Sequence, residues 1–371
     1  MTIALIGTGF IGPVHVEALR RLGKTVVGVL GSSPDRSAKA ARQLGVSTAY
    51  ESLDQLLADG RVESVHIASP NRHHFEQAKQ ILAVGKSVVC EKPLAMNSDE
   101  SRTLVELAAK SNTTAAVCYN IRFYPICLEM RSRIAAGEIG AIHHITGSYV
   151  QDWLLHDTDF NWRVLAEDGG ELRAVADIGT HWLDLAQFVT GLTIHEVCAD
   201  LRTVVPTRYR PAGSVDTFQG KLGRAGSIPV AITTEDYASV LFGCGGGCRG
   251  ALTVSQVMAG RKNQATLEIA GAKGSMAWNS ERPNELWLGH RDRPNESLIR
   301  DPALLHKEVR PYANYPGGHN EGFPDSFKQL FRAIYDGGAA SIVPTFADGH
   351  REVLLCEAIL RSHRDRAWRT V

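Results

Sequence analysis

The first third of this chain alternates short apolar runs with amphipathic stretches, and this pattern constrains the fold more than any other feature of the sequence. It extends from residue 2 to about residue 118. Strands that alternate with helices form parallel sheets covered by helices on both faces. We therefore expect an α/β domain with strands at Ile3–Ile6, Thr25–Leu30, Val65–Ala68, Ser87–Cys90 and Thr114–Cys118, and helices at Val14–Leu22, Arg36–Leu44, His74–Val84 and Asp99–Ala109.

A glycine-rich turn follows the first expected strand and leads into the first helix. Its sequence is Gly7-Thr-Gly9-Phe10-Ile11-Gly12. In a GxGxxG fingerprint the first glycine permits a tight turn, the second lets the backbone approach a pyrophosphate, and the third allows close packing of helix on strand. The helix N-terminus then faces the phosphates. We predict that this turn, including Phe10 and Ile11, binds a dinucleotide.

The end of the second strand bears on the choice of cofactor. An acidic residue there would bind the ribose hydroxyls of NAD, but the segment after Leu30 reads Gly-Ser32-Ser33-Pro-Asp-Arg36. Two hydroxyls and a guanidinium suit the 2′-phosphate of NADP. We predict NADP(H) as the favoured cofactor, with NAD(H) as the alternative. On that alternative Ser33 only caps the next helix and Arg36 is a solvated surface residue.

The loop after the strand Val65–Ala68 extends the expected cofactor site. It contains Ser69, Asn71 and His74. Because this loop leaves the same edge of the sheet as the glycine turn, these three side chains are expected to contact the cofactor. An N-cap role for Asn71 is an equally good interpretation.

The strand Ser87–Cys90 runs into Glu91-Lys92-Pro93. Pro93 lacks an N–H and holds the preceding residue in extended geometry, so the strand cannot continue. Ligands of open α/β sheets bind outside the carboxyl ends of the strands, where Lys92 would meet the reactive end of a cofactor. We predict an active-site lysine. The alternative is an exposed loop charge.

Composition narrows the class of protein. A length of 371 residues exceeds what one core usually holds and favours two domains. The 40 Lys and Arg residues balance 40 Asp and Glu residues, which argues against a nucleic-acid or anionic-membrane partner. No apolar run is long enough to span a bilayer, and no basic leader precedes the first strand, so we expect a cytoplasmic protein. Seven cysteines, an odd number, predict reduced thiols.

No metal site is expected. The closest approach to a metal signature is Cys244-Gly-Gly-Gly-Cys248, which lies between two β-like runs. Its glycines suit a hairpin turn with positive φ, and no second Cys or His pair stands nearby at zinc-site spacing.

Beyond Cys118 the pattern changes. A polar and aromatic bridge and a helix to about Ala136 lead into longer β-like runs with short glycine-rich turns, which pair as hairpins in a mainly antiparallel sheet. We place an α/β domain at residues 1–120 and an α+β domain at residues 121–344, and expect the last helix, Ala347–His363 within residues 345–371, to return to the first domain. The expected strands are Ile142–Tyr149, Glu196–Val204, Ile228–Glu235, Val240–Phe242, Gly250–Gln256, Ala265–Ala270 and Ser275–Trp278.

A cluster of ionisable residues lies inside the second domain. If a helix begins near Ile178, then Asp177, His181 and Asp184 share one of its faces. An imidazole between two carboxylates supplies a proton acceptor and groups to orient it. The alternative is an ordinary amphipathic helix in which Asp177 is the N-cap and His181 pairs with Asp184.

Three motifs together carry a family resemblance. Gly7-x-Gly9-x-x-Gly12, Glu91-Lys92-Pro93 and Asp177-x-Gly-x-His181-x-x-Asp184 occur in this order along a chain that closes with Pro344-Thr-Phe-Ala-Asp-Gly349. This arrangement resembles the glucose-fructose oxidoreductase / inositol dehydrogenase (Gfo/Idh/MocA) family of sugar and cyclitol oxidoreductases. The resemblance implies a Rossmann domain and a second domain with a large open-faced sheet that mediates homodimer or homotetramer contacts. It also implies hydride transfer between nicotinamide and a sugar or cyclitol carbinol.

The resemblance further implies the roles of individual residues. Lys92, Asp177 and His181 would be catalytic and would contact the substrate: His181 accepts the hydroxyl proton, Lys92 stabilises the oxyanion, and Asp177 holds Lys92 or a substrate hydroxyl. The remaining expected cofactor contacts are Glu91, Lys92, Asn120 and Arg163, and the remaining expected substrate contacts are Arg122, Trp153 and Arg163.

Two other functions stay open on the sequence alone. One is a nicotinamide-sensing regulator, which binds cofactor without turnover and which in this family lacks the catalytic lysine. The other is an NAD-dependent glycosidase that oxidises, eliminates and reduces again. The charged insert Glu171–Ala176 departs from the commonest form of the family and leaves the substrate unidentified.

Overall fold

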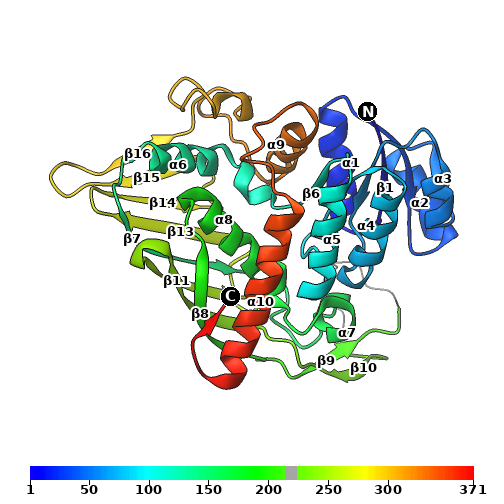
Figure 1. The fold of residues 1–371 in the computed structure, drawn as a ribbon. Helices are drawn as coiled ribbons and strands as arrows, with labels where there is room; N and C mark the ends of the chain where they lie inside the picture. Colours follow the sequence, from blue (N-terminus) through cyan, green and yellow to red (C-terminus); the bar gives the residue numbers. More distant parts are fainter. Residues whose placement is uncertain (214–223) are drawn as a thin grey trace.

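The computed structural model describes residues 1–213 and 224–371, which form two large sheets lying side by side (Figure 1). The first sheet has the order β3-β2-β1-β4-β5-β6 and all its strands are parallel. The expected α/β architecture is confirmed, and the short strand β3, which has few apolar residues, was missed. The strands are β1 (Thr2–Ile6), β2 (Thr25–Leu30), β3 (Thr48–Tyr50), β4 (Ser64–Ile67), β5 (Ser87–Cys90) and β6 (Ala115–Val117).

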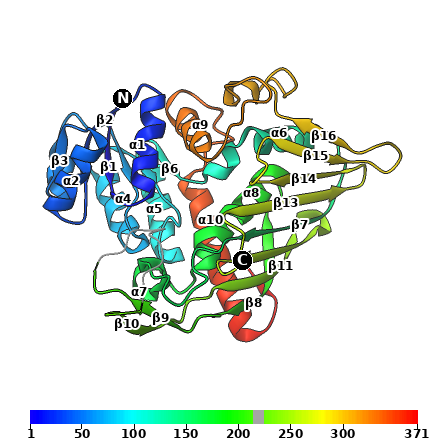
Figure 2. The same ribbon diagram turned by 180° about the vertical axis from the view of Figure 1, so that it is seen from behind.

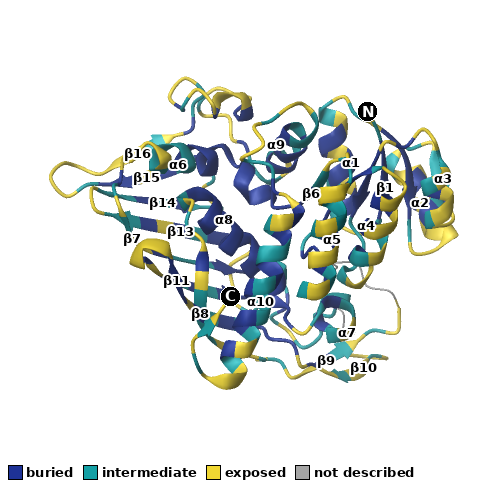
Figure 3. Ribbon diagram, in the orientation of Figure 1, coloured by how far each residue is buried: buried dark blue, intermediate teal, exposed yellow. Residues whose placement is uncertain are grey.

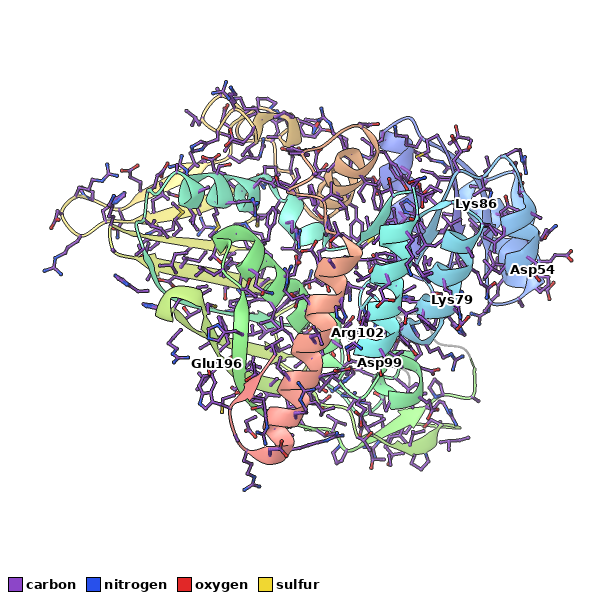
Figure 4. All side chains as sticks on the ribbon, in the orientation of Figure 1. Asp54, Lys79, Lys86, Asp99, Arg102 and Glu196 are labelled. Atoms are coloured by element: carbon purple, nitrogen blue, oxygen red, sulfur yellow. The ribbon has the colours of Figure 1, made fainter. Side chains whose placement is uncertain are left out.

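Helices cover both faces of this sheet. Ile3 and Leu5 of β1 pack in the core that includes Leu19 of α1, whereas Ala4 and Ile6 pack in a second core on the other face. Alternate side chains of a strand point to opposite faces, so a strand buried on both faces is apolar throughout. Figure 4 shows the charged Lys79, Asp99 and Arg102 on the outer surfaces of α4 and α5. The helices are α1 (Ile11–Arg21), α2 (Pro34–Leu44), α3 (Leu53–Ala58), α4 (His74–Ala83) and α5 (Ser98–Lys110).

The second sheet is mainly antiparallel, as expected, and has the order β16-β15-β14-β13-β7-β12-β11-β8-β17. Its central pair is an exception, because β7 and β12 run parallel. The strands are β7 (Ile142–Val150), β8 (Ile194–Arg202), β11 (Tyr237–Cys244), β12 (Arg249–Ser255), β13 (Gln264–Gly271), β14 (Ser275–Asn279), β15 (Glu285–Gly289), β16 (Glu296–Ile299) and β17 (Arg369–Thr370).

One predicted strand does not join the large sheet as expected. The run expected at Ile228–Glu235 forms the shorter strand β10 (Ile228–Ala231), which pairs with β9 (Thr207–Arg210) in a separate two-stranded sheet. None of the four β10 residues is fully buried, so this strand offers no apolar face to the large sheet. The turn at Cys244–Cys248 does connect the antiparallel strands β11 and β12, with Gly246 and Gly247 at positive φ.

Helices cover one face of the nine-stranded sheet and leave the other open. In Figure 1 α6 (Pro125–Ala135) and α8 (Thr180–Thr190) lie in front of the sheet, and the view from behind in Figure 2 shows its strands uncovered. Almost every residue of α8 is buried (Figure 3). A short helix, α7 (Ala166–Gly169), precedes it. Single 3₁₀ turns occur at Asn71–His73, Asn120–Phe123, Trp162–Val164, Gly245–Gly247 and Arg310–Tyr312.

The two C-terminal helices bring the end of the chain back to the first sheet. The helix α9 (Phe323–Tyr335), which was not predicted, packs on α1. The helix α10 (Phe346–Asp365) contacts α5 on one side and β8 on the other, and so runs between the two sheets (Figure 1). A bridge from Thr345 to Ala116 of β6 fixes its start. All seven cysteines are free thiols, as expected, and none of the described helices is long and apolar enough to cross a membrane.

Candidate active site

The glycine turn has the geometry that a dinucleotide requires. Gly7 follows β1 with φ of 94°, and a Cβ atom there would lie 2.3 Å from the backbone of Ala68. A Cβ atom on Gly12 would lie 2.4 Å from the carbonyl oxygen of Gly7, whereas one on Gly9 would meet no atom within 4 Å. The first and third glycines are therefore required by packing, and the second leaves open space at the start of α1. That space fits a pyrophosphate at a helix N-terminus.

The remaining residues predicted on this side of the cofactor site are exposed, except for Ile11, which is half-buried. Phe10 lies 46% exposed at the start of α1, and Ile11 begins that helix. Ser32, Ser33 and Arg36 lie exposed at the carboxyl end of β2. The Ser33 hydroxyl oxygen accepts a hydrogen bond from the Arg36 backbone N–H at 3.3 Å, so it does cap α2. Both side chains remain accessible to a ligand at this edge.

The loop after β4 connects the two halves of the molecule. The amide nitrogen of Asn71 donates to the carbonyl of Gly169 at 2.9 Å, and Ser69 donates to Gln77 at 2.6 Å. The helix-capping alternative for Asn71 is therefore not observed.

His74 was predicted to bind cofactor, and the structure corrects that assignment. Its ring is fully buried, with its nitrogens 2.7 Å and 2.9 Å from the carbonyl oxygens of Pro93 and Ser69. The imidazole thus joins the loop that follows β4 to the loop that follows β5, and it supports the site without facing a ligand.

Lys92 forms the central contact of the site. It follows β5, and the bond to Pro93 is cis. Its Nζ donates to the Asp177 carboxylate Oδ1 at 2.9 Å and to the Asp177 carbonyl at 2.7 Å. The Lys92 side chain is only 11% exposed. The interpretation as an exposed loop charge is therefore excluded, and the structure brings together two of the three predicted catalytic residues.

Asp177 is an ionised carboxylate held from several sides. It lies in a π-helical turn, Val175–Gly179, which runs directly into α8. The helix therefore begins before Ile178, and the alternative interpretation of Asp177 as its N-cap is not observed. Gln256 donates to its Oδ2 at 2.8 Å, and the Arg163 guanidinium lies 3.3 Å from its Oδ1. Burial acts to raise the pKa of Asp177, but the charges of Lys92 and Arg163 outweigh it and hold that pKa well below its usual range.

His181 lies one helical turn beyond Asp177 and is 8% exposed. Its Nδ1 is buried and has no hydrogen-bond partner among the described residues, and the rings of Tyr119 and Tyr149 lie 5.7 Å and 6.5 Å away. Burial and the nearby charge of Lys92 lower the pKa of His181 to about 3. The imidazole is therefore neutral at physiological pH and has a free lone pair for a proton.

Asp184 and Arg122 belong to a different cluster. The guanidinium of Arg122 forms a forked, buried ion pair with Asp184, and it lies 3.3 Å from Asp348 and 4.7 Å from the ring of Phe188. Arg122 is 4% exposed. The predicted substrate contact of Arg122 is corrected, because Arg122 and Asp184 satisfy each other inside the core. The alternative pairing of His181 with Asp184 is not observed for the same reason.

Other predicted residues divide between site and core. Trp153 donates to Gln151 at 2.9 Å, and Gln151 in turn contacts Gln256, so Trp153 belongs to the polar network that reaches Asp177.

Asn120 is buried and donates to Ser326 of α9 at 2.8 Å, which gives its predicted cofactor contact no support. Within the charged insert Arg173 turns inward and is buried against Asp236, whereas Glu171 is exposed.

Sequence reasoning missed Gln256, which directly follows β12 and is fully buried. Glutamine has no strong preference for helix or strand. The one signal in the sequence was its position at the end of the predicted strand Gly250–Gln256. Gln256 matters because it fixes the orientation of the Asp177 carboxylate.

One grouping among the described residues has the composition of a metal site. The ligand atoms of His15, Glu91 and Cys118 all lie within 4.8 Å of one another. Burial raises the pKa of the Cys118 thiol well above its usual range, and the His15 nitrogen is already engaged with Glu91 at 3.1 Å. A protonated thiol is a poor metal ligand, so we assign these residues to a hydrogen-bonded cluster.

Comparison with known proteins agrees with this geometry over most of the chain. Residues 1–119 match the model of an oxidoreductase family with an NAD-binding Rossmann fold, and residues 127–277 match the Gfo/Idh/MocA C-terminal domain. The chain belongs to the Gfo/Idh/MocA family. The family resemblance inferred from its three motifs is therefore confirmed, as is the NAD-binding Rossmann fold of its first domain.

Several relatives are sugar or cyclitol dehydrogenases. Levoglucosan dehydrogenase of Pseudarthrobacter phenanthrenivorans is 30% identical over 99% of this chain and 97% of its own length. Myo-inositol 2-dehydrogenase of Thermotoga maritima is 27% identical over 66% of this chain and 74% of its own. A structure of levoglucosan dehydrogenase with NADH and L-sorbose superposes with a TM-score of 0.88 at 28% identity, covering 100% of this chain and 98% of that one.

The Arg122–Asp184 pair generates a stability prediction. Asp184→Ala leaves the buried Arg122 guanidinium with Asp348 as its remaining carboxylate partner. The substitution should lower the free energy of unfolding by about 3 kcal/mol. Glu171→Ala, which removes an exposed ion pair to Arg364, is the control and should change it by less than about 1 kcal/mol. Urea unfolding measures both. Equal stability of the two variants would contradict the assignment of Arg122 to the core.

Proposed function

We propose that this protein is an NAD(P)-dependent dehydrogenase that oxidises a carbinol of a sugar, cyclitol or related polyol, and reduces the ketone in the reverse direction. One observation carries the proposal: a charged lysine, tied to an ionised carboxylate, lies beside a neutral, unpaired histidine at the carboxyl end of β5. The names of the relatives support the substrate class.

The chain supplies three functions at this point. A bound nicotinamide provides the hydride acceptor, and the glycine turn, with Ser69 and Arg163, would hold the dinucleotide. Two of the three N–H groups of Lys92 are bonded to Asp177, which leaves the third for the carbinol oxygen. Positive charge there stabilises the developing alkoxide, and His181 takes the proton.

The low pKa of His181 determines what His181 and Lys92 each contribute to the reaction. An imidazole with a pKa of about 3 is a weak base when the site is empty. Lys92 offsets this weakness, because its charge lowers the pKa of the bound hydroxyl. Asp177 keeps Lys92 in place, and the Gln151–Gln256 network with Trp153 offers a polar and aromatic wall suited to a polyol.

The proposal extends to assembly. The open face of the second sheet exposes Leu241 at 51% and Trp287 at 38%, and we propose that it forms the contact of a homodimer or homotetramer. The balance of charges supports a small-molecule substrate rather than a nucleic acid or membrane partner.

The experiment that tests this proposal also distinguishes it from two other functions. Oxidation followed by elimination would give glycoside cleavage without net change in cofactor, and a sensor would bind cofactor without turnover. The presence of both Lys92 and His181 favours the dehydrogenase over the sensor. Purified protein is tested with levoglucosan, L-sorbose and myo-inositol while the absorbance of the reduced cofactor is followed, and turnover supports the proposal.

Variants of Lys92 and His181 test the mechanism. Lys92→Ala and His181→Ala should each lower kcat by roughly 10²–10⁴, the range for a positioned acid–base or oxyanion group, with cofactor Kd near native. The combined effect should be less than additive, because a base without its oxyanion partner has little left to contribute. Lys79→Ala, on the outer surface of α4 (Figure 4), is the control and should leave kcat unchanged. Near-normal turnover by either site variant removes that residue from the mechanism.

The lowered pKa of His181 predicts the pH profile. Because the folded protein holds this pKa at about 3 instead of about 6.5, the imidazole stays neutral above roughly pH 5. The acid limb of kcat/KM, which reports the free enzyme, should therefore lie below pH 5. An acid limb near pH 6.5 that is lost in His181→Ala would show that the imidazole is solvated in the working enzyme.

We propose a preference for NADP(H) over NAD(H). The support is the exposed pair of hydroxyls and the guanidinium at the end of β2, where no carboxylate follows Leu30 directly. The Kd for NADPH should be below that for NADH, and Arg36→Ala should raise the former about tenfold, since a hydrogen bond to a charged group contributes about 1.5 kcal/mol. Arg42→Ala, on the last turn of α2, is the matched control. Tighter binding of NADH in a fluorescence titration contradicts the preference.

A further inference from the structure

A chain of buried polar side chains extends from Glu91 across the first sheet to α9. The Glu91 Oε1 lies 3.1 Å from His15 Nε2, and His15 Nδ1 lies 2.9 Å from His66 Nδ1. The His66 Nε2 lies 2.7 Å from the Tyr335 hydroxyl, which is 2.8 Å from the Ser64 hydroxyl. These five residues come from α1, β4, α9 and the loop that follows β5.

The surroundings of this chain exclude bulk solvent. His15, Ser64 and His66 have no exposed surface. The ring of Phe331 packs edge-on against both imidazoles, at 4.9 Å from His15 and 4.7 Å from His66. Because no water replaces a lost partner in such a place, each buried donor needs an acceptor inside the chain.

Donor and acceptor roles follow from one end of the chain. A carboxylate only accepts, so the nitrogen facing Glu91 carries a proton and donates. In a neutral His15 the Nδ1 then has a lone pair and must accept from His66 Nδ1–H. His66 Nε2 in turn has a lone pair and accepts from the Tyr335 hydroxyl. With a neutral His15, the direction of every hydrogen bond in the chain is thus set by the charge on Glu91.

The charge states that this scheme requires of Glu91, His66 and Tyr335 agree with their surroundings. Burial acts to raise the pKa of Glu91, but the hydrogen bond from His15 and the charge of Lys92 outweigh it and lower that pKa. Burial holds the pKa of His66 well below its usual value and raises that of Tyr335. Glu91 is therefore ionised, while His66 and Tyr335 are neutral.

The chain ends at the proposed catalytic lysine. The second oxygen of Glu91 accepts a hydrogen bond from the backbone N–H of Lys92 at 3.2 Å. We propose that His15, His66 and Tyr335 are positioning residues that form a one-way hydrogen-bond relay, which fixes the Glu91 carboxylate and through it the Lys92 loop. The catalytic consequence rests on the dehydrogenase function proposed above, whereas the direction of the relay does not.

The direction of the relay is tested without substrate. In wild-type protein labelled with ¹⁵N-histidine, NMR should show His15 protonated at Nε2 and His66 at Nδ1. In Glu91→Gln the amide oxygen still accepts from Lys92 N–H, which turns the NH₂ group towards His15. His15 must then accept at Nε2, and both histidines should switch to the opposite tautomer. His66 would thus respond although it does not touch residue 91. Unchanged tautomers, or a wild-type His66 protonated at Nε2, overturn the relay. If Glu91→Gln does not fold, the wild-type tautomers alone decide.

Kinetics test the positioning role. His15→Ala removes the donor to a buried carboxylate, so the pKa of Glu91 should rise into the measurable range. We expect kcat to be about tenfold lower at pH 6 than at pH 8 in this variant and flat over the same range in wild type. The matched control is His306→Ala, which breaks a His–carboxylate pair of 3.0 Å to the buried Glu129 and should change only the melting temperature.

The outcomes separate the two proposals. A pH profile of His15→Ala that superimposes on wild type reduces His15 to a packing role and overturns the positioning proposal. If the wild-type protein turns over no polyol, the dehydrogenase proposal fails and the catalytic role of the relay fails with it. The tautomers of His15 and His66 still decide whether the relay exists.

Discussion

The ion pair between Lys92 and Asp177 is the contact on which the rest of the site depends. Lys92 leaves the first sheet at the end of β5, and Asp177 lies at the entrance to α8 under the second sheet. A buried charge is tolerated only when it is paired and its remaining hydrogen-bonding positions are filled. Asp177 meets this condition through Lys92, Arg163 and Gln256. The two sheets are therefore held at a fixed distance where their loops meet.

Other buried charges in the described chain are also paired, at greater distance from the site. Arg122 is shared by Asp184 and Asp348, and Arg173 and Arg208 share Asp236. Such clusters are weak evidence for net stability, because the cost of removing the charges from water nearly balances their attraction. Their directional hydrogen bonds do select one arrangement of the elements that carry them. We infer that the cluster of Arg122, Asp184 and Asp348 specifies the position of α8, because apolar contacts between buried residues (Figure 3) have little directional preference.

The sequence predicts the parts of the fold that are periodic and the parts of the site that are motifs. The strands of the first sheet were visible because both their faces are buried, and Lys92 because Pro93 ends a strand there. The beginning of the helix at Asp177 was misplaced, since a π-helical turn has no distinct hydrophobic period. His74 was assigned to the cofactor because its loop leaves the same edge of the sheet as the glycine turn, and Arg122 and Asn120 were assigned to ligands through the family resemblance. Only the three-dimensional partners show that these charges and dipoles are satisfied by protein.

The return of the chain through α9 and α10 has a consequence for biosynthesis. Tyr335 completes the buried polar chain under the first sheet, and Thr345 bridges to its edge strand β6. Domains generally fold in the order in which the ribosome releases them. Here the nucleotide-binding half, although encoded first, waits for α9 and α10 before its polar groups are paired and its edge is covered. A nascent chain that stalls before α9 therefore exposes an unfinished sheet, and its maturation depends on the synthesis of these two helices.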